Sequence, residues 1–277
     1  MRRPVRKPLL RVAVVLLFLG GLAPSVRGLE VPSARRTWLA LQTPHFLIVS
    51  DARRGRVHDV ALELERMVAA IGRVAPLLAR SYLPIEAFLF ASDSDFEDYC
   101  TAVAGRSCNG LAGLFVPGRH RNYILISPSR FEEARAIACH ELTHSFVRNT
   151  SPDIPLWLNE GLAEFYGSFT AVGKDIRIGR PDEQHLATLR QKGLLPLATV
   201  LAVTDDSPEY NTQGLRPIFY AESWLLTHYL LVETPKGRTR LSEYLARLQR
   251  GEDREQAFHA AFGTGTEEFK KELSALK

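Results

Sequence analysis

The pentapeptide His140-Glu-Leu-Thr-His144 constrains this chain more than any other stretch of its sequence. Residues four apart lie on one face of a helix, so the rings of His140 and His144 can both reach one metal ion. Glu141 lies about 100° round such a helix from His140, so its carboxylate is free to take a proton from a water at the metal. The pattern predicts a helix here and favours metal-assisted hydrolysis.

The residues around the pentapeptide also indicate a helix, and they turn its histidines away from the obvious core. Ser129 and Glu132 are spaced as a capping box before an apolar-periodic run. The apolar side is formed by Phe131, Ala138, Leu142 and Phe146, and the two histidines project from nearly the opposite side. A helix whose two histidines make ordinary hydrogen bonds is the alternative at this point.

A second helix is predicted over residues 155–166, entered through a proline and carrying Glu160 and Glu164 one turn apart on one face. A catalytic zinc site needs three protein ligands and one open position, and two His with one Glu is an established set. The turn between the helices is rich in Asn, Ser, Pro and Asp, which lets the chain reverse. We therefore expect His140, His144 and Glu160 to bind one Zn²⁺. Glu164 is expected to accept a hydrogen bond from a ligand histidine, and a solvated charge is its alternative.

Together these segments resemble a known group of enzymes. His140-Glu-Leu-Thr-His144 followed by Trp157-Leu-Asn-Glu160-Gly-Leu-Ala-Glu164 is similar to the gluzincin metallopeptidases, in particular the peptidase MA-like proteins. The resemblance is strongest over residues 131–166. It implies that His140, His144 and Glu160 bind zinc and that Glu141 is the catalytic base.

Two further segments can be compared with the aminopeptidases of this group, one around a tyrosine and one where those enzymes carry an acidic motif. The related aminopeptidases use a tyrosine in a broadly similar place to Tyr220, which is the leading candidate for stabilising the oxyanion, with a core tyrosine as the alternative. His228 is the second choice. Those aminopeptidases also have an acidic, glycine-started motif, but the corresponding segment here, Gly110-Leu-Ala-Gly-Leu-Phe115, holds no acid. An endopeptidase is therefore favoured over an aminopeptidase.

Residues 1–28 have the pattern of a secretory signal peptide. Basic residues precede an apolar run over residues 12–19, and small residues follow at Ser25 and Gly28. The uninterrupted apolar stretch is about a dozen residues against the ~20 that a membrane-spanning helix needs, which favours a cleaved signal over a retained anchor. We expect export to the periplasm or the extracellular space, with no stable membrane span after cleavage.

Removal of that segment changes the charge. The chain has 35 basic and 31 acidic residues, and residues 1–28 hold six of the basic ones and no acid, which leaves 29 against 31. The balance is then close to neutral, and no basic cluster is interleaved with aromatic residues, so nucleic acid is not expected as a partner. The expected partner is a peptide or protein substrate.

The chain has three cysteines, so at most two of them can pair in a disulfide within one exported chain. Cys100 and Cys108 are close enough to form a disulfide that closes a short loop, which an oxidising compartment permits. A thiolate of Cys139 would point about 100° away from His140 on the helix, so a buried thiol is favoured over a metal ligand there. Five further histidines have no motif context and are interpreted as structural: His45, His58, His120, His185 and His259.

The fold class expected is α+β, as a single metallopeptidase-like domain over residues 29–277. A mixed-sheet lobe, residues 29–150, carries the histidine helix, a mainly helical lobe covers residues 151–277, and the active-site cleft lies between them. Strands are predicted over residues 45–50, 85–90, 111–116 and 123–127, with a strand or hairpin over 172–180. Helices are predicted over residues 56–78, 94–99, 220–232, 238–250, 254–262 and 266–276. The last strand before the histidine helix is expected to pair with an extended substrate by strand addition.

These observations favour an exported zinc metallopeptidase. A second hypothesis is a non-catalytic binding or assembly module of the same fold that keeps zinc for stability. Glu141 argues against it, because a purely structural site has no use for a base and normally closes its fourth position. A metal-free scaffold with a fortuitous motif would require Glu160 and its helix to be a coincidence as well.

Overall fold

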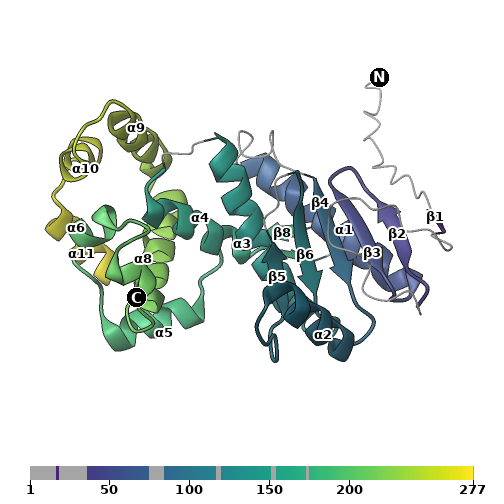
Figure 1. Ribbon diagram of the computed structural model, residues 1–277. Helices are drawn as coiled ribbons and strands as arrows, with labels where there is room; N and C mark the ends of the chain where they lie inside the picture. Colours follow the sequence, from purple (N-terminus) through teal and green to yellow (C-terminus); the bar gives the residue numbers. More distant parts are fainter. Residues whose placement is uncertain are drawn as a thin grey trace, which may run out of the picture. The chain divides into compact units, whose positions relative to one another are not determined.

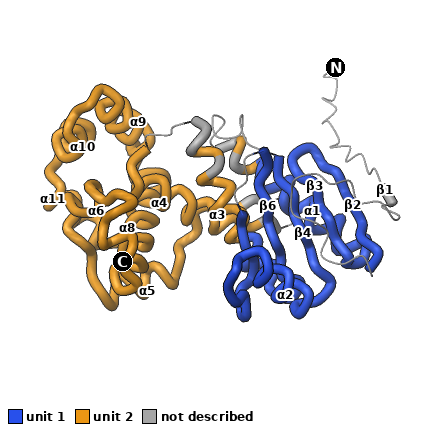
Figure 2. The backbone as a smooth tube through the Cα atoms, viewed as in Figure 1, with its two compact units in different colours: residues 1–69, 83–135 blue, residues 70–82, 136–277 orange. Residues whose placement is uncertain are grey.

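The structure is a computed structural model that describes residues 17–18, 36–74, 84–116, 120–150, 154–172 and 175–276. The chain forms two compact units, residues 1–69 with 83–135 and residues 70–82 with 136–277 (Figure 2). A mixed sheet occupies the N-terminal half and helices dominate the C-terminal half, so the α+β prediction is confirmed. The expected signal peptide, residues 1–28, lies outside the described residues apart from Leu17 and Phe18.

The sheet of the first unit has six strands in the order β1-β2-β3-β4-β6-β5. The central strands β3, β4 and β6 are parallel, and the outer pairs are antiparallel. The four strands predicted from the sequence are present, whereas β2 was not predicted, because four residues are too few to show an alternating pattern. The bounds are β1 (Leu17–Phe18), β2 (Leu39–Gln42), β3 (Phe46–Ser50), β4 (Ile85–Leu89), β5 (Gly113–Val116) and β6 (Asn122–Ile126).

The prediction that β6 accepts a substrate strand is wrong. One edge of β6 pairs in parallel with β4 and the other pairs antiparallel with β5. Residues 123–126 are therefore paired on both edges within the sheet, and strand addition requires an open edge. The hydrophobic pattern that predicted a strand could not reveal its place in the sheet.

Two helices pack beside this sheet (Figure 1): α1 (Arg54–Val74), of which residues 54–69 belong to the first unit, and α2 (Asp93–Ala104). The part of the predicted helix beyond residue 74 lies outside the described residues. The side chain of Ser92 caps α2 by accepting a hydrogen bond from the backbone N–H of Asp95 at 3.3 Å. One sheet face and α2 share a core formed by Trp38, Val49, Phe88, Phe90, Phe96, Cys100, Cys108, Tyr123 and Leu125.

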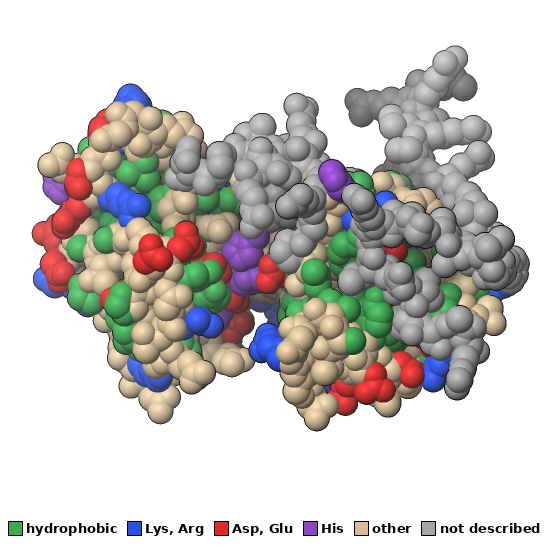
Figure 3. All heavy atoms as spheres, in the orientation of Figure 1, with side chains coloured by type: hydrophobic (Ala, Val, Ile, Leu, Met, Phe, Trp, Pro, Cys, Tyr) green, Lys and Arg blue, Asp and Glu red, His purple; other side chains and the backbone are tan. Residues whose placement is uncertain are grey.

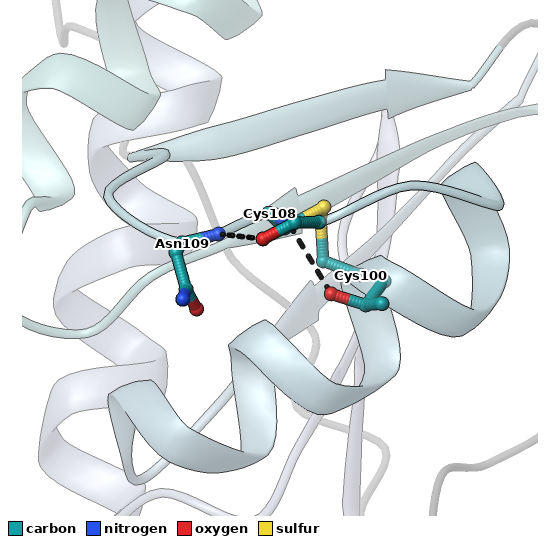
Figure 4. Close-up of a disulfide and its surroundings, with 5 residues drawn as sticks. Cys100, Cys108 and Asn109 are labelled. Carbon is teal, nitrogen blue, oxygen red and sulfur yellow. Dashed lines mark hydrogen bonds between the residues drawn. A yellow bond between two sulfur atoms is a disulfide. The ribbon is translucent and has the colours of Figure 1, made fainter.

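A disulfide joins Cys100, in α2, to Cys108 in the loop that follows (Figure 4). The two Cα atoms are 5.9 Å apart, and both side chains are fully buried in the core just described. The sequence had left this pairing open. The bond fixes the loop that leads from α2 to β5.

The second unit is largely helical. The histidine motif lies in α3 (Phe131–Thr150), which begins at Phe131 rather than directly after Ser129, and Glu132 pairs with Arg135 at 2.6 Å. The predicted hairpin is present as β7 (Thr170–Val172) and β8 (Asp175–Arg177). The other helices are α4 (Leu156–Gly167), α5 (Glu183–Lys192), α6 (Leu197–Ala202), α7 (Pro208–Asn211), α8 (Arg216–His228), α9 (Gly237–Gln249), α10 (Arg254–Phe262) and α11 (Thr266–Ser274), with a π-helical turn, η2 (Tyr229–Glu233), continuing α8.

The charge of the surface and the length of the helices are relevant to whether the protein binds nucleic acid or spans a membrane. On the face drawn in Figure 3, the acidic and basic side chains of the described residues are interspersed. No helix in the part of the chain that the structure describes combines the length and apolar character needed to cross a membrane. The expected absence of a nucleic-acid partner stays a prediction.

Helices α4 and α8 pack closely in the second unit, and Gly161 makes this approach possible. A Cβ atom added to Gly161 would lie 2.2 Å from Oγ1 of Thr227 and 2.3 Å from the carbonyl oxygen of Ser223, both in α8. Trp157 and Trp224 are almost fully buried in the core that these two helices share. Any side chain at position 161 would push the helices apart.

We predict that Gly161→Ala lowers the free energy of unfolding by about 1–3 kcal/mol, because the added methyl group overpacks a backbone contact. Denaturant unfolding followed by circular dichroism measures the change. Gly167→Ala in the same helix is the control, since its Cβ would meet no atom closer than 3.6 Å. Equal stability of the Gly161→Ala variant and the wild type would contradict the close packing of α4 and α8.

We predict that Cys100→Ala with Cys108→Ala lowers the free energy of unfolding by about 2–3 kcal/mol, the value expected for a disulfide that closes a short loop. Thermal melts of the double variant and of the wild type with and without a reducing agent test this. The reductant should shift the wild-type midpoint and leave that of the double variant in place. A reductant-insensitive wild type would refute the disulfide.

Candidate metal centre

Side chains on the two faces of α3 differ in their exposure to solvent. Phe131, Ala138, Leu142 and Phe146 are buried, as the hydrophobic pattern predicts. His140 and His144 keep 18 % and 16 % of their side chains exposed, so they project from the other side. Cys139 is buried, as expected. The helix thus presents two imidazoles at the surface of the second unit.

Helix α4 brings Glu160 to these imidazoles. Its Oε2 atom lies 3.6 Å from Nε2 of His140 and 3.5 Å from Nε2 of His144, and the two Nε2 atoms are 3.0 Å apart. The N-cap position of α4 is Pro155, so the helix starts where the sequence predicts. Three ligand-type atoms from two helices therefore converge on one point.

The spacing of these atoms fits a tetrahedral zinc ion. Bonds of about 2.0–2.1 Å hold the ligand atoms of such an ion about 3.3–3.4 Å apart. The Glu160 carboxylate is 3 % exposed, and its Oε2 atom has no well-directed hydrogen-bond donor among the described residues. A buried carboxylate oxygen normally has a partner. A bound cation would accept the lone pairs of this oxygen and of the two imidazole nitrogens, and would thus be the partner that the oxygen lacks.

The second ring nitrogen of each imidazole, Nδ1, is also in contact with a side chain of α4. Nδ1 of His144 lies 3.0 Å from Oδ1 of Asn159, and Nδ1 of His140 lies 3.4 Å from Oε1 of Glu164. Both acceptors favour the tautomer with hydrogen on Nδ1, which leaves the Nε2 lone pairs free to bind a cation shared with Glu160. Glu164 therefore lies where the sequence predicts a supporting carboxylate.

The electrostatics of the cluster favour charged groups. Burial raises the pKa of Glu160, but its contact with His144 and the nearby imidazole charges outweigh burial and lower the pKa below its usual value. Burial likewise lowers the pKa of His144, yet Glu160 raises it above the usual value. The carboxylate is thus ionised at neutral pH and stabilises positive charge next to it.

The cluster lies in a pocket of about 670 Å³ whose described lining residues all belong to the second unit. Glu141 lines this pocket and is not one of the three converging ligand groups. Among the described residues it is therefore a carboxylate that lines the pocket without joining the cluster. The lining also includes the following residues: Val147, Ile154, Pro155, Leu156, Val203, Thr204, Asp205, Leu248, Glu252 and Arg254.

Two tyrosines line the same pocket. The ring of Tyr220, in α8, is parallel to that of His140 at 6.4 Å, and the ring of Tyr210, in α7, is parallel to that of Tyr220 at 6.1 Å. The hydroxyl of Tyr210 donates a hydrogen bond to Oε1 of Glu160 at 3.2 Å. Burial and the charge of Glu160 raise the pKa of both phenols, so both remain hydrogen-bond donors at neutral pH.

The sequence predicts some site residues and misses others. His228, the second choice for the oxyanion, instead packs on Trp224 with ring centroids 5.3 Å apart and is not among the residues that line the pocket. Asn159 was recognisable only as the neighbour of Glu160. Tyr210 and His185, which contacts Glu164 at 3.1 Å, had no recognisable signal, because both reach the site through tertiary packing.

A family model described as "Protein of unknown function (DUF1570)" matches residues 135–251. The matched stretch contains the three converging ligands, Glu141, both tyrosines and the residues that support the imidazoles. No curated protein and no solved structure matches the chain.

Proposed function

We propose that this protein is a zinc-dependent metallopeptidase of the gluzincin type. The observation that carries the proposal is the convergence of Nε2 of His140, Nε2 of His144 and Oε2 of Glu160 within 3.0–3.6 Å of one another, in an open pocket that Glu141 also lines. Among the described residues three ligand groups converge without a fourth, which favours a catalytic site, because structural zinc sites are closed by a fourth protein ligand. His140, His144 and Glu160 would hold one zinc ion.

Zinc bound at these residues would polarise the scissile carbonyl and lower the pKa of the attacking water. The residues of the chain do the remaining work. Glu141 accepts the proton of the attacking water and returns it to the leaving amine. The hydroxyl of Tyr220 donates a hydrogen bond to the developing oxyanion, and Tyr210 holds the carboxylate of Glu160 in place.

The substrate class follows from the pocket and the sequence. The pocket is open, and the segment Gly110-Leu-Ala-Gly-Leu-Phe115 carries no acid to capture a free amino terminus. We therefore propose an endopeptidase that cuts peptide or protein substrates. The disulfide between Cys100 and Cys108 supports export, because such bonds persist in oxidising compartments.

We predict that the purified protein binds about one zinc ion per chain and that Glu141→Gln retains the zinc but lowers peptide hydrolysis by about 10²–10⁴-fold, the usual contribution of a general base. Metal analysis and cleavage of amino-terminally acetylated, internally quenched peptides measure the two effects. Glu133→Gln is the matched control, because this glutamate lies in α3 with 57 % of its side chain exposed.

Each outcome of that experiment has a distinct meaning. A wild type with well below one zinc per chain would refute the metal centre. Zinc-loaded wild type and Glu141→Gln that are equally inert on every acetylated and free peptide would favour the binding or assembly module. Cleavage of free peptides alone would overturn the endopeptidase assignment.

We predict different defects for the two tyrosines. Tyr220→Phe should lower kcat by about 10²-fold with zinc affinity unchanged, since it removes an oxyanion donor. Tyr210→Phe should weaken zinc binding, because Glu160 loses its hydrogen bond. Steady-state kinetics and competition with a chromophoric chelator separate the two effects. Tyr229→Phe is the control, because its hydroxyl bonds to the exposed Glu272 at 2.9 Å.

A further inference from the structure

Glu164 joins two histidines, only one of which belongs to the metal centre. Its Oε1 atom lies 3.4 Å from Nδ1 of His140, and its Oε2 atom lies 3.1 Å from Nε2 of His185. Glu164 keeps 23 % of its side chain exposed and is not among the described residues that line the pocket. Both of its oxygens are therefore used to connect imidazoles rather than to face a substrate.

His185 is itself held in place by its own helix and by α8. It lies in the first turn of α5, where its backbone N–H donates to Oδ1 of the N-cap residue Asp182 at 2.9 Å. Its ring packs at 5.6 Å from that of Trp224, which is 1 % exposed. The side chain of His185 is 16 % exposed, so this ring is largely enclosed.

The second contact changes what Glu164 can do. A glutamate has three side-chain torsions, and a single contact with His140 at 3.4 Å leaves rotations that break it. The hydrogen bond from His185, whose ring is anchored on α5 and α8, removes most of that freedom. Groups that hydrogen-bond the partners of ligand histidines fix the orientation and tautomer of the ligand and raise metal affinity.

We propose that His185 is a positioning residue for the metal centre, acting through Glu164 on His140. It donates its Nε2 hydrogen to Glu164, which in turn accepts the Nδ1 hydrogen of His140. The Nε2 lone pair of His140 is thereby kept available to the zinc ion that His144 and Glu160 would share. This inference rests on the proposed zinc site and extends it to α5, an element that contributes no ligand.

Substitution of His185 by glutamine or by asparagine provides the test, because both side chains end in an amide group but differ in length. The amide nitrogen of glutamine takes the place of Nε2 and can still donate to Glu164, whereas the shorter asparagine cannot reach it. We expect His185→Asn to weaken zinc binding by about 3–10-fold, below the 10–100-fold typical of a direct supporting partner, and His185→Gln to stay within about twofold of the wild type. Competition with a chromophoric chelator measures the affinities, and the absorption of the cobalt-substituted protein reports on ligand geometry.

A double-mutant cycle with Glu164→Ala tests whether the effect passes through Glu164. In that background His185→Asn should cause no further loss of zinc affinity. The exposed His259 supplies the control, and His259→Asn should bind zinc like the wild type. Thermal melts of the metal-free proteins separate a positioning effect from a loss of fold, because His185→Asn and His185→Gln remove the same ring packing on Trp224.

The proposal is overturned if folded His185→Asn binds zinc as tightly as His185→Gln, or if its effect is the same with and without Glu164. Equal weakening of zinc binding by both substitutions would assign the role to ring packing and also overturn it. A wild type that binds no zinc would refute the proposed function itself, and the inference with it. Zinc-binding wild type with unaffected variants would refute the inference alone.

Discussion

The carboxylate of Glu160 is the constraint on which the organisation of the second unit depends. It is 3 % exposed, and taking an ion of this kind out of water costs several kcal/mol unless it is compensated. Compensation comes from two imidazoles of α3 and from the hydroxyl of Tyr210 in α7. Helices distant in the sequence therefore meet around one carboxylate. The neighbouring Gly161 separately allows α4 to pack tightly against α8.

Helix α4 supplies both the ligand and the supports of the centre. Asn159 contacts Nδ1 of His144, and Glu164 contacts Nδ1 of His140. Glu160, between them in the sequence, contacts Nε2 of both histidines. The two rings are thus held at both nitrogens by side chains from a single helix. A rigid element that carries several supports positions a site more accurately than a loop does. The tight approach of α4 to α8 therefore fixes the helix from which these three side chains project.

The sequence predicts most of the helices and strands that surround the site, because hydrophobic periodicity is a local property. It misses β2, which is too short to show a pattern, and it gives no bounds for α5, α6 and α7. It also requires an open edge on β6, although both edges are paired. Strand order depends on contacts between distant segments, which a single sequence does not display. The same limit applies to His228, whose place on α8 resembles a site position but whose ring packs on Trp224.

The sequence by itself determined the residues that depend on helix geometry. The spacing of His140 and His144, and of Glu160 and Glu164, places each pair on one face whatever the rest of the chain does. Only the tertiary structure decided that Tyr210 holds Glu160 and that His185 holds Glu164, because these contacts span fifty and twenty-one residues of chain. Local periodicity dictates which groups share a surface, whereas packing between helices dictates which surfaces meet.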